Sequence, residues 1–209
     1  VFKRFLAGKL INVEIQHSLG KVFNTCRTND EKTTALFEFM TKRGQSHYEE
    51  SVTQLEHALQ TAFLARQASE PAENIVAALL HDVGHFLMDE CGGEVDFREV
   101  DWNHEVVGAN HARQWFVEVV SESIRLHVPA KRYLCTVDSA YFDQLSVASR
   151  NSFRLQGGAF SLTETKQFEQ ENYFEVAIKL RRWDDQAKVT GLQVPPLDSY
   201  REEVASCIL

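Results

Sequence analysis

The stretch "AALLHDVGHFL", residues 77–87, begins as an apolar helix and then places His81, Asp82 and His85 within five residues. A buried imidazole or carboxylate costs free energy unless it has a partner, and a metal ion is the strongest partner available. Neighbours on a helix point about 100° apart, so His81 and Asp82 face one centre only near a helix end or across two metal ions. Gly84 supports a helix end here. The stretch therefore predicts a metal site, provided that other segments supply the remaining ligands.

The composition is that of one compact domain with a substantial core: 209 residues, of which 44% are hydrophobic and 25% charged. The net charge of -8 argues against nucleic acid and anionic membranes as partners, and no apolar run is long enough to span a bilayer. The four cysteines are scattered without a CxxC pair, which argues against a disulfide framework or a cysteine zinc site. We therefore expect a cytoplasmic protein that binds a small molecule.

The N-terminal segment is basic, and Glu14 is the only acid among its first 28 residues. Such a segment is compatible with a mitochondrial transit peptide, which would place the protein in the mitochondrion instead of the cytoplasm. A plain helical extension is the alternative interpretation. Neither interpretation bears on the metal site.

Apolar residues recur every three or four positions along most of the chain, while period-two alternation is nearly absent. This spacing predicts helices over residues 30–43, 50–67, 73–83, 104–120, 121–127, 139–150, 163–169, 173–185 and 197–207. The helix over 73–83 is almost wholly apolar, so we expect it at the centre of the fold. Pro129 is expected to end the helix that contains His127. The sequence thus predicts an all-α fold with several helices packed around a polar centre.

Three more histidines are candidate ligands. His57 lies in "TQLEHALQTAFLA", on a helix that otherwise has a buried pattern, although a lone histidine there is more often a satisfied core residue. His104 opens one predicted helix and His127 closes another. The alternative for both is an ordinary surface position. A helical metal site needs ligands from several inward-facing helices, which is what these positions offer.

Asp184 completes the candidate set, because it follows an apolar helix and stands beside Trp183. Its neighbour Asp185 is expected to be a solvated acid. The candidate ligands are therefore four histidines and two aspartates: His57, His81, His104, His127, Asp82 and Asp184. One metal ion does not need six such ligands, whereas two ions that share a bridging carboxylate do. Mixed imidazole and carboxylate ligation suits iron, manganese or zinc better than calcium or magnesium.

Five blocks carry a family resemblance: "QLEHALQTA", "AALLHDVGH", "NHEVVGANH", "HVPAKRYL" and "RRWDDQAKV". The order H…HD…D is the mark of the HD-domain superfamily, and the blocks together resemble the PhnZ-like oxygenases. The resemblance implies an all-α HD-domain helical bundle with a dinuclear metal site at its centre. It runs from about residue 47 to the C-terminus. We therefore divide the chain into an N-terminal extension and helix over residues 1–44 and an HD-domain diiron oxygenase over residues 45–209.

The resemblance also implies a mixed-valent Fe(II)/Fe(III) pair with O2 as co-substrate. Four residues at the matching positions would hold the first iron: His57, His81, Asp82 and Asp184. Asp82 would bridge to the second iron, which His104 and His127 also bind. Asp82, Glu50 and Lys131 would carry the reaction.

A phosphonate substrate requires positive charge near the metal ions. Lys131 follows His127 by one helical turn, and Arg181 precedes Asp184 by nearly one turn, so both can point toward the site. Ordinary surface charges that extend along a helix are the alternative. The matching family positions imply five phosphonate contacts: His85, Lys131, Ser149, Gln156 and Arg181.

The amine end of the substrate is assigned to Glu50, which lies about two helical turns before His57. The family has a tyrosine three residues before this glutamate, where it caps the iron until substrate arrives. This chain has His47 at that position and Tyr48 one residue later, so either is a candidate gate. A trimethylammonium substrate is an alternative to the free amine, because a cation needs only a carboxylate or an aromatic wall.

The resemblance therefore predicts O2-dependent cleavage of the carbon–phosphorus bond of a 1-hydroxy-2-aminoethylphosphonate, or its N-trimethylated analogue. The products would be phosphate and glycine, or glycine betaine, in organophosphonate catabolism. The main alternative is an HD-domain metal-dependent phosphohydrolase that acts on a nucleotide or phosphate ester. Two others are a diiron oxygenase that acts on a different alcohol, such as inositol, and a catalytically silent HD domain used for binding.

Overall fold

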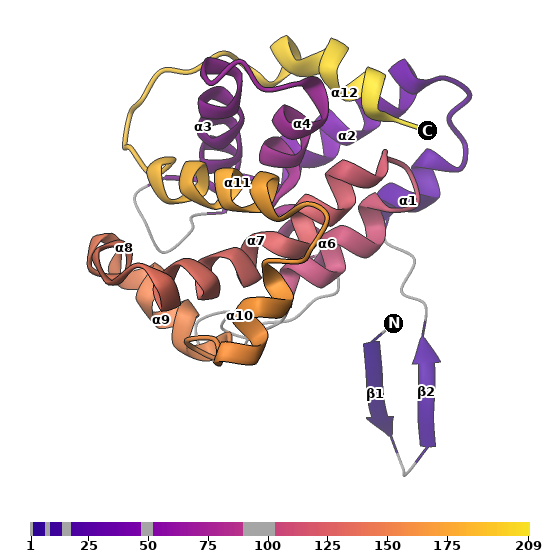
Figure 1. The fold of residues 1–209 in the computed structure, drawn as a ribbon. Coiled ribbons are helices and arrows are strands. Elements are labelled where there is room, and N and C mark those ends of the chain that lie inside the picture. Colours follow the sequence, from indigo (N-terminus) through magenta and orange to yellow (C-terminus); the bar gives the residue numbers. More distant parts are fainter. Residues whose placement is uncertain (1, 7–8, 14–17, 47–51, 90–102) are drawn as a thin grey trace.

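The computed structural model describes residues 2–6, 9–13, 18–46, 52–89 and 103–209 (Figure 1). The helices are α1 (Ser18–Phe23), α2 (Asn29–Arg43), α3 (Gln54–Gln67), α4 (Ala72–Leu80), α5 (Val83–Asp89), α6 (His104–Ala112), α7 (Glu118–Val137), α8 (Ser139–Gln144), α9 (Val147–Leu155), α10 (Leu162–Phe168), α11 (Phe174–Gln186), the 3-10 helix η1 (Leu197–Tyr200) and α12 (Arg201–Cys207). Among the described residues, no helix is long and apolar enough to cross a membrane.

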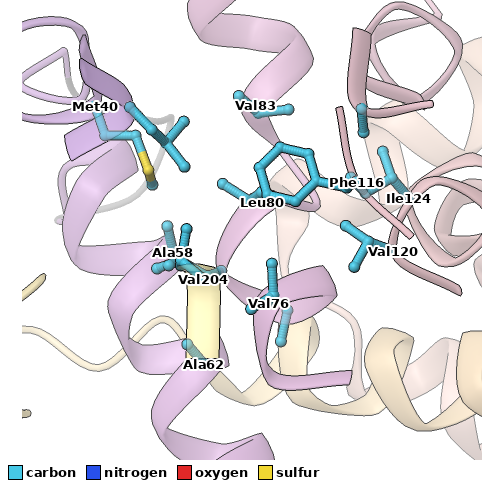
Figure 2. Packing of buried hydrophobic residues seen from close by; sticks show 14 of the residues in the cluster. Met40, Ala58, Ala62, Val76, Leu80, Val83, Phe116, Val120, Ile124 and Val204 are labelled. Carbon is cyan, nitrogen blue, oxygen red and sulfur yellow. The ribbon is translucent and has the colours of Figure 1, made fainter. Parts of the chain in front are cut away.

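The helix α4 lies at the centre of the core, as its apolar sequence predicts. Val76 and Leu80 pack between Ala58 and Val204 on one side and Val120 on the other (Figure 2). All seven residues from 74 to 80 are buried. This central position holds the residue after α4, His81, inside the protein.

The start of α3 is fixed by a capping box. The Thr53 hydroxyl accepts a hydrogen bond from the Glu56 backbone N–H at 3.1 Å, and the Glu56 carboxylate accepts one from the Thr53 N–H at 2.6 Å. Such reciprocal bonds satisfy donors that a helix start leaves free. Because the box sets where α3 begins, it also sets which face of the helix carries His57.

The helix α7 differs from the prediction, because it continues through Pro129 and ends at Val137. A proline inside a helix removes one backbone hydrogen bond at a cost of about 3 kcal/mol. Here α7 packs against α4, α6 and α11 across the middle of the bundle (Figure 1), and this burial offsets the cost. His127 consequently lies in the middle of a helix and not at its end.

Two other boundaries also differ from those predicted. The predicted helix over residues 139–150 is divided into α8 and α9, because Ser146 begins α9 by accepting a hydrogen bond from the Ser149 N–H at 3.1 Å. The predicted helix over residues 104–120 ends at Ala112, and α7 begins only at Glu118.

The N-terminal residues form an antiparallel pair, β1 (Phe2–Leu6) and β2 (Lys9–Val13), with Phe2 opposite Val13. The expectation of a helical extension is therefore wrong over these residues. Aromatic and β-branched residue types favour strands, and "FKRFL" and "KLINV" contain several of them. Figure 1 shows the pair apart from the helical bundle.

Candidate metal centre

Six side chains from distant parts of the chain converge at the centre of the bundle. Each is at most 6% exposed. They come from α3 (His57), the end of α4 (His81), the turn before α5 (Asp82), the first residue of α6 (His104), α7 (His127) and α11 (Asp184). These are the six candidate ligands predicted from the sequence. His104 and His127 are buried and do not occupy the surface positions that were the alternative.

Asp82 stands between two pairs of histidines. Its Oδ2 atom lies 3.6 Å from Nε2 of His57 and 3.4 Å from Nε2 of His81. Its Oδ1 atom lies 3.3 Å from Nε2 of His104 and 3.6 Å from Nε2 of His127. Each carboxylate oxygen thus faces a different pair, which is the arrangement of a carboxylate that bridges two metal ions.

Asp184 adds a carboxylate to the first pair. Its Oδ1 lies 3.3 Å from Nε2 of His57, and its Oδ2 lies 3.8 Å from Nε2 of His81. His57, His81 and Asp184 form one group that could hold a metal ion, and Asp82, His85 and His104 form a second. The two groups differ in their donors, because the first has a carboxylate of its own besides the shared Asp82.

The histidine tautomers favour cation binding. Nδ1 of His57 lies 2.8 Å from the Ala187 carbonyl oxygen, and Nδ1 of His81 lies 2.9 Å from that of Ala78. A carbonyl only accepts, so each Nδ1 carries the hydrogen and, in the neutral ring, Nε2 keeps its lone pair. His127 follows the same rule, with Nδ1 2.7 Å from the carbonyl oxygen of residue 124. Backbone carbonyls of this kind orient metal-binding imidazoles.

The Nε2 atoms then meet at distances that need a cation or a proton between them. His57 Nε2 and His81 Nε2 are 3.1 Å apart, and so are His104 Nε2 and His127 Nε2. Two lone pairs that face each other in a buried site repel, and a metal ion between each pair would remove the repulsion. The donor set therefore fits two transition-metal ions.

The charges of the site are strongly coupled. Burial lowers the pKa of His81, but the carboxylates of Asp82 and Asp184 outweigh burial and raise it to about 9. Burial raises the pKa of Asp82, but the imidazoles of His81, His104 and His127 hold it well below its usual range. A proton on His81 therefore partly compensates the buried carboxylates, and a bound metal ion would replace that proton.

His85 lies on the side of the second pair. Its ring stacks on the His104 ring with centroids 4.0 Å apart, and its Nε2 is 4.0 Å from Asp82 Oδ1. Burial and the neighbouring His104 lower the pKa of His85 to about 3. A neutral His85 beside the second pair can offer a hydrogen bond to a bound ligand.

Arg181 and Lys131 are both buried, each 3% exposed, and are not ordinary surface charges. Arg181 Nη1 lies 2.5 Å from Asp184 Oδ2, and Arg181 Nε donates to Asp185 Oδ2 at 3.1 Å. Tyr141 also donates to Asp185 through its hydroxyl. The expectation that Asp185 is a solvated acid is therefore wrong, because this carboxylate holds Arg181 in place behind Asp184.

The remaining predicted substrate residues lie at the two ends of α9 or outside the described part of the chain. Ser149 accepts a hydrogen bond from Lys188 Nζ at 2.9 Å. Gln156 follows the last residue of α9, and its Oε1 is buried. The three other predicted residues lie outside the described part of the chain: His47, Tyr48 and Glu50.

The sequence analysis missed three residues that contact the predicted ligand and substrate residues. Glu105 is buried, and its Oε2 lies 3.6 Å from Nδ1 of His104. Ser152 accepts a hydrogen bond from Lys131 Nζ at 2.8 Å. Lys188 lies four residues after Asp184, a spacing that could have indicated it. Ser152 lies three residues after Ser149, which places both on one helix face.

An all-α bundle in which a histidine, an adjacent histidine–aspartate pair and a distant aspartate converge defines the HD-domain class of metalloproteins. A family model described as "HD domain" matches residues 55–150. The predicted fold class is therefore confirmed.

Comparison with known proteins narrows the class. The chain is 52% identical over 198 residues to a hydroxymethylphosphonate dioxygenase of Gimesia maris, and the match covers 95% of this chain and 98% of that protein. It is 41% identical over 155 residues to a 1-hydroxy-2-(trimethylamino)ethylphosphonate dioxygenase (glycine-betaine-forming) of Leisingera caerulea, with 74% and 79% covered. An uncharacterised protein L432 of Acanthamoeba polyphaga mimivirus is 36% identical over 160 residues, with 76% and 73% covered. The chain belongs to the PhnZ-like family of HD-domain oxygenases.

Proposed function

We propose that this protein is a diiron dioxygenase that cleaves the carbon–phosphorus bond of a 1-hydroxyphosphonate. The observation that carries the proposal is the position of Asp82, whose two oxygens face two separate histidine pairs. A site for a single metal ion has no need of the second pair. The buried cations Lys131 and Arg181 beside this centre supply the charge that a phosphonate requires.

The first candidate substrate is hydroxymethylphosphonate, by analogy with the Gimesia maris relative, whose match spans nearly the whole of both chains. Its cleavage would give formate and phosphate. The second candidate is a 1-hydroxy-2-aminoethylphosphonate or its N-trimethylated form, which would give glycine or glycine betaine. The Leisingera caerulea relative and the predicted amine contact Glu50 support this second candidate.

The metal ligands would be divided between two iron ions. One iron would be held by His57, His81, Asp82 and Asp184, and the other by Asp82, His104 and His127. A mixed-valent Fe(II)/Fe(III) pair supplies the redox chemistry that reduces O2 at the expense of the substrate.

The protein residues would bind and orient the phosphonate. Lys131 and Arg181 would neutralise its charge, and Ser149 and Gln156 would fix its oxygens by hydrogen bonds. His85, held neutral by burial, would donate one further hydrogen bond. The closed bundle would exclude bulk water from the site, which strengthens each of these interactions.

The overall reaction balances without another reductant. Hydroxymethylphosphonate and O2 contain the atoms of formic acid and phosphate, and the carbinol carbon gives up the electrons that O2 accepts. The carbon–phosphorus bond breaks, and the phosphorus leaves as phosphate. The phosphohydrolase alternative needs no O2 at all, so the two functions are separable by experiment.

The test is to load the purified protein with iron under argon, reduce it partially, and supply each candidate hydroxyphosphonate with and without O2. We expect phosphate release that matches O2 uptake and stops under argon. The substrate with the highest kcat/KM shows which substituent on the carbinol carbon the site accepts: hydrogen, aminomethyl or trimethylaminomethyl. Phosphate release from a nucleotide or phosphate ester under argon, without hydroxyphosphonate cleavage in air, would replace this proposal with the phosphohydrolase.

A further inference from the structure

Two lysines meet on one face of α9. Lys131 Nζ, from α7, donates to Ser152 Oγ at 2.8 Å, and Lys188 Nζ, from the segment after α11, donates to Ser149 Oγ at 2.9 Å. The two serines lie one helical turn apart on the same face, and Ser152 Oγ also donates to the Ser149 carbonyl at 3.2 Å. Two ammonium groups from distant segments therefore lie beside the same helical turn.

The charges around this turn favour an anion. Among the described residues, the hydrogen-bond partner of the buried Lys131 ammonium is the neutral hydroxyl of Ser152. Burial lowers the pKa of Lys131 to about 7, and the positive charges of Arg181 and Lys188 contribute to the lowering. Arg181 is already paired with two carboxylates. The carboxylates of Asp184 and Asp185 act on the pKa of Lys131 in the opposite sense, but both are already paired with Arg181. An added anion would therefore still stabilise the buried ammonium.

Lys188 is held in place from both sides by α3. The Ala187 carbonyl oxygen lies 2.8 Å from Nδ1 of His57. The Val189 N–H donates to Gln60 Oε1 at 3.0 Å, and the Val189 carbonyl accepts from Gln60 Nε2 at 2.9 Å. The helix that carries a predicted metal ligand thus also fixes the backbone of Lys188. Such fixing is what a residue needs to bind a ligand in one geometry.

We propose that Lys188 is a phosphonate-binding residue that contacts the substrate together with Ser149 and completes a three-cation subsite with Lys131 and Arg181. The inference rests on the proposed function, because it assumes a phosphonate at this site. A dianion would accept from both ammonium groups where the serine hydroxyls now accept. Three cations select a doubly charged phosphonate over an uncharged alcohol.

The experiment compares Lys188→Met with Lys188→Arg and with the control Lys179→Met. Lys179 lies on α11, its side chain is half-exposed, and it pairs with Glu70 at 2.8 Å, away from the predicted ligands. Each iron-loaded variant is assayed for KM and kcat with hydroxymethylphosphonate and for calorimetric binding of methylphosphonate, which lacks the hydroxyl. Iron content and circular dichroism are measured on the same samples.

We expect Lys188→Met to raise KM and weaken methylphosphonate binding by about ten- to a hundredfold, the usual range for a hydrogen bond to a charged group. Lys188→Arg should retain most of the affinity, and Lys179→Met should match the wild type. Unchanged KM and methylphosphonate affinity in Lys188→Met would overturn the inference. A loss of iron or helicity in Lys188→Met would also overturn it, because Lys188 would then act through the fold.

The inference and the proposed function can fail separately. If the wild type cleaves hydroxymethylphosphonate and Lys188→Met has the same KM, only the inference fails. If the wild type cleaves no hydroxyphosphonate but binds methylphosphonate in a way that depends on Lys188, the subsite stands and the proposed reaction is wrong.

Discussion

The carboxylate of Asp82 lies within 3.6 Å of four imidazole nitrogens, two at each oxygen. No other described residue touches both histidine pairs in this way. An amide at the same position would offer one oxygen and one NH2 group, which cannot bind a metal ion, so it could serve one pair only. The assignment of a bridging ligand therefore depends on this one side chain.

We predict that Asp82→Asn binds one iron ion in place of a pair. O2-dependent turnover should fall by at least about a hundredfold. This exceeds the loss that is typical when a residue hydrogen-bonded to a metal ligand is replaced. Metal analysis by mass spectrometry and the electron paramagnetic resonance signal of the partially reduced protein measure the change. Asp198→Asn, at an exposed carboxylate that pairs with Arg201, is the control. A coupled iron pair in Asp82→Asn would refute the bridge.

Arg181 is expected to stabilise the fold in addition to binding the substrate, because it pairs with the carboxylates of Asp184 and Asp185, which are largely buried. Arg181→Met would leave Asp184 and Asp185 without their cation and should lower the free energy of unfolding of the metal-free protein by about 3–5 kcal/mol. Urea titration measures this loss. The half-exposed pair of Arg113 with Glu122 offers a control, since Arg113→Met should cost at most about 1 kcal/mol. Equal losses in the two variants would contradict the prediction.

At the scale of secondary-structure elements, the close approach of α5 and α6 places His104 beside Asp82. A Cβ on Gly84 would overlap the carbonyl oxygen of His104 and lie 2.7 Å from its carbonyl carbon. Only a glycine lets the two backbones come this close. A helix end was expected near Gly84, and α4 does end at Leu80. Gly84 itself lies in the first turn of the next helix, α5, in contact with α6.

Gly84→Ala should push α6 away from α5 and move His104 away from Asp82. Overpacking of this kind costs about 1–3 kcal/mol of stability. We expect the variant to lose the second iron while the first, held by α3, α4 and α11, remains. Titration with iron and resonance spectroscopy distinguish the two sites. Gly20→Ala in α1 is the control, because among the described residues its Cβ would meet only His111 Cε1, at 3.7 Å. Retention of both irons in Gly84→Ala would be the contrary result.

Other element boundaries show the limit of local patterns. The recurrence of apolar residues every three or four positions located α3, α4 and α11 within a few residues. The rule that proline ends a helix failed at Pro129, because α7 gains its stability from three helices that lie on both sides of it. A rule based on the local sequence does not account for stability that comes from packing against other helices.

Across the whole molecule, the predicted ligands join α3, α4, α6, α7 and α11, so bound metal would act as a cross-link between distant segments. Ligands that bind only the folded state add about 4 kcal/mol to the free energy of unfolding at a thousand times the Kd. In a chain of this length that corresponds to a Tm increase of roughly 10 °C. Differential scanning calorimetry with iron and after chelation tests this. Magnesium, a poor partner for imidazole, should give no comparable shift.

The extent of the family relationship is also a property of the whole chain. The motif blocks begin near residue 47, and the division between residues 1–44 and 45–209 rests on them. The alignment with the Gimesia maris protein covers 95% of the chain and therefore reaches into most of residues 1–44. The division remains a proposal about how the two segments differ in function.

The sequence by itself determined the helical class and the six candidate ligands, because apolar periodicity and the places of histidines and aspartates within the predicted helices can be read along the chain. Only the tertiary structure decided which oxygen of Asp82 faces which histidine pair, and that Arg181 is engaged by Asp184 and Asp185. It also brought Lys188 to Ser149. These features depend on the packing of segments far apart in sequence, and no pattern within one segment encodes the distance between two side chains on different helices.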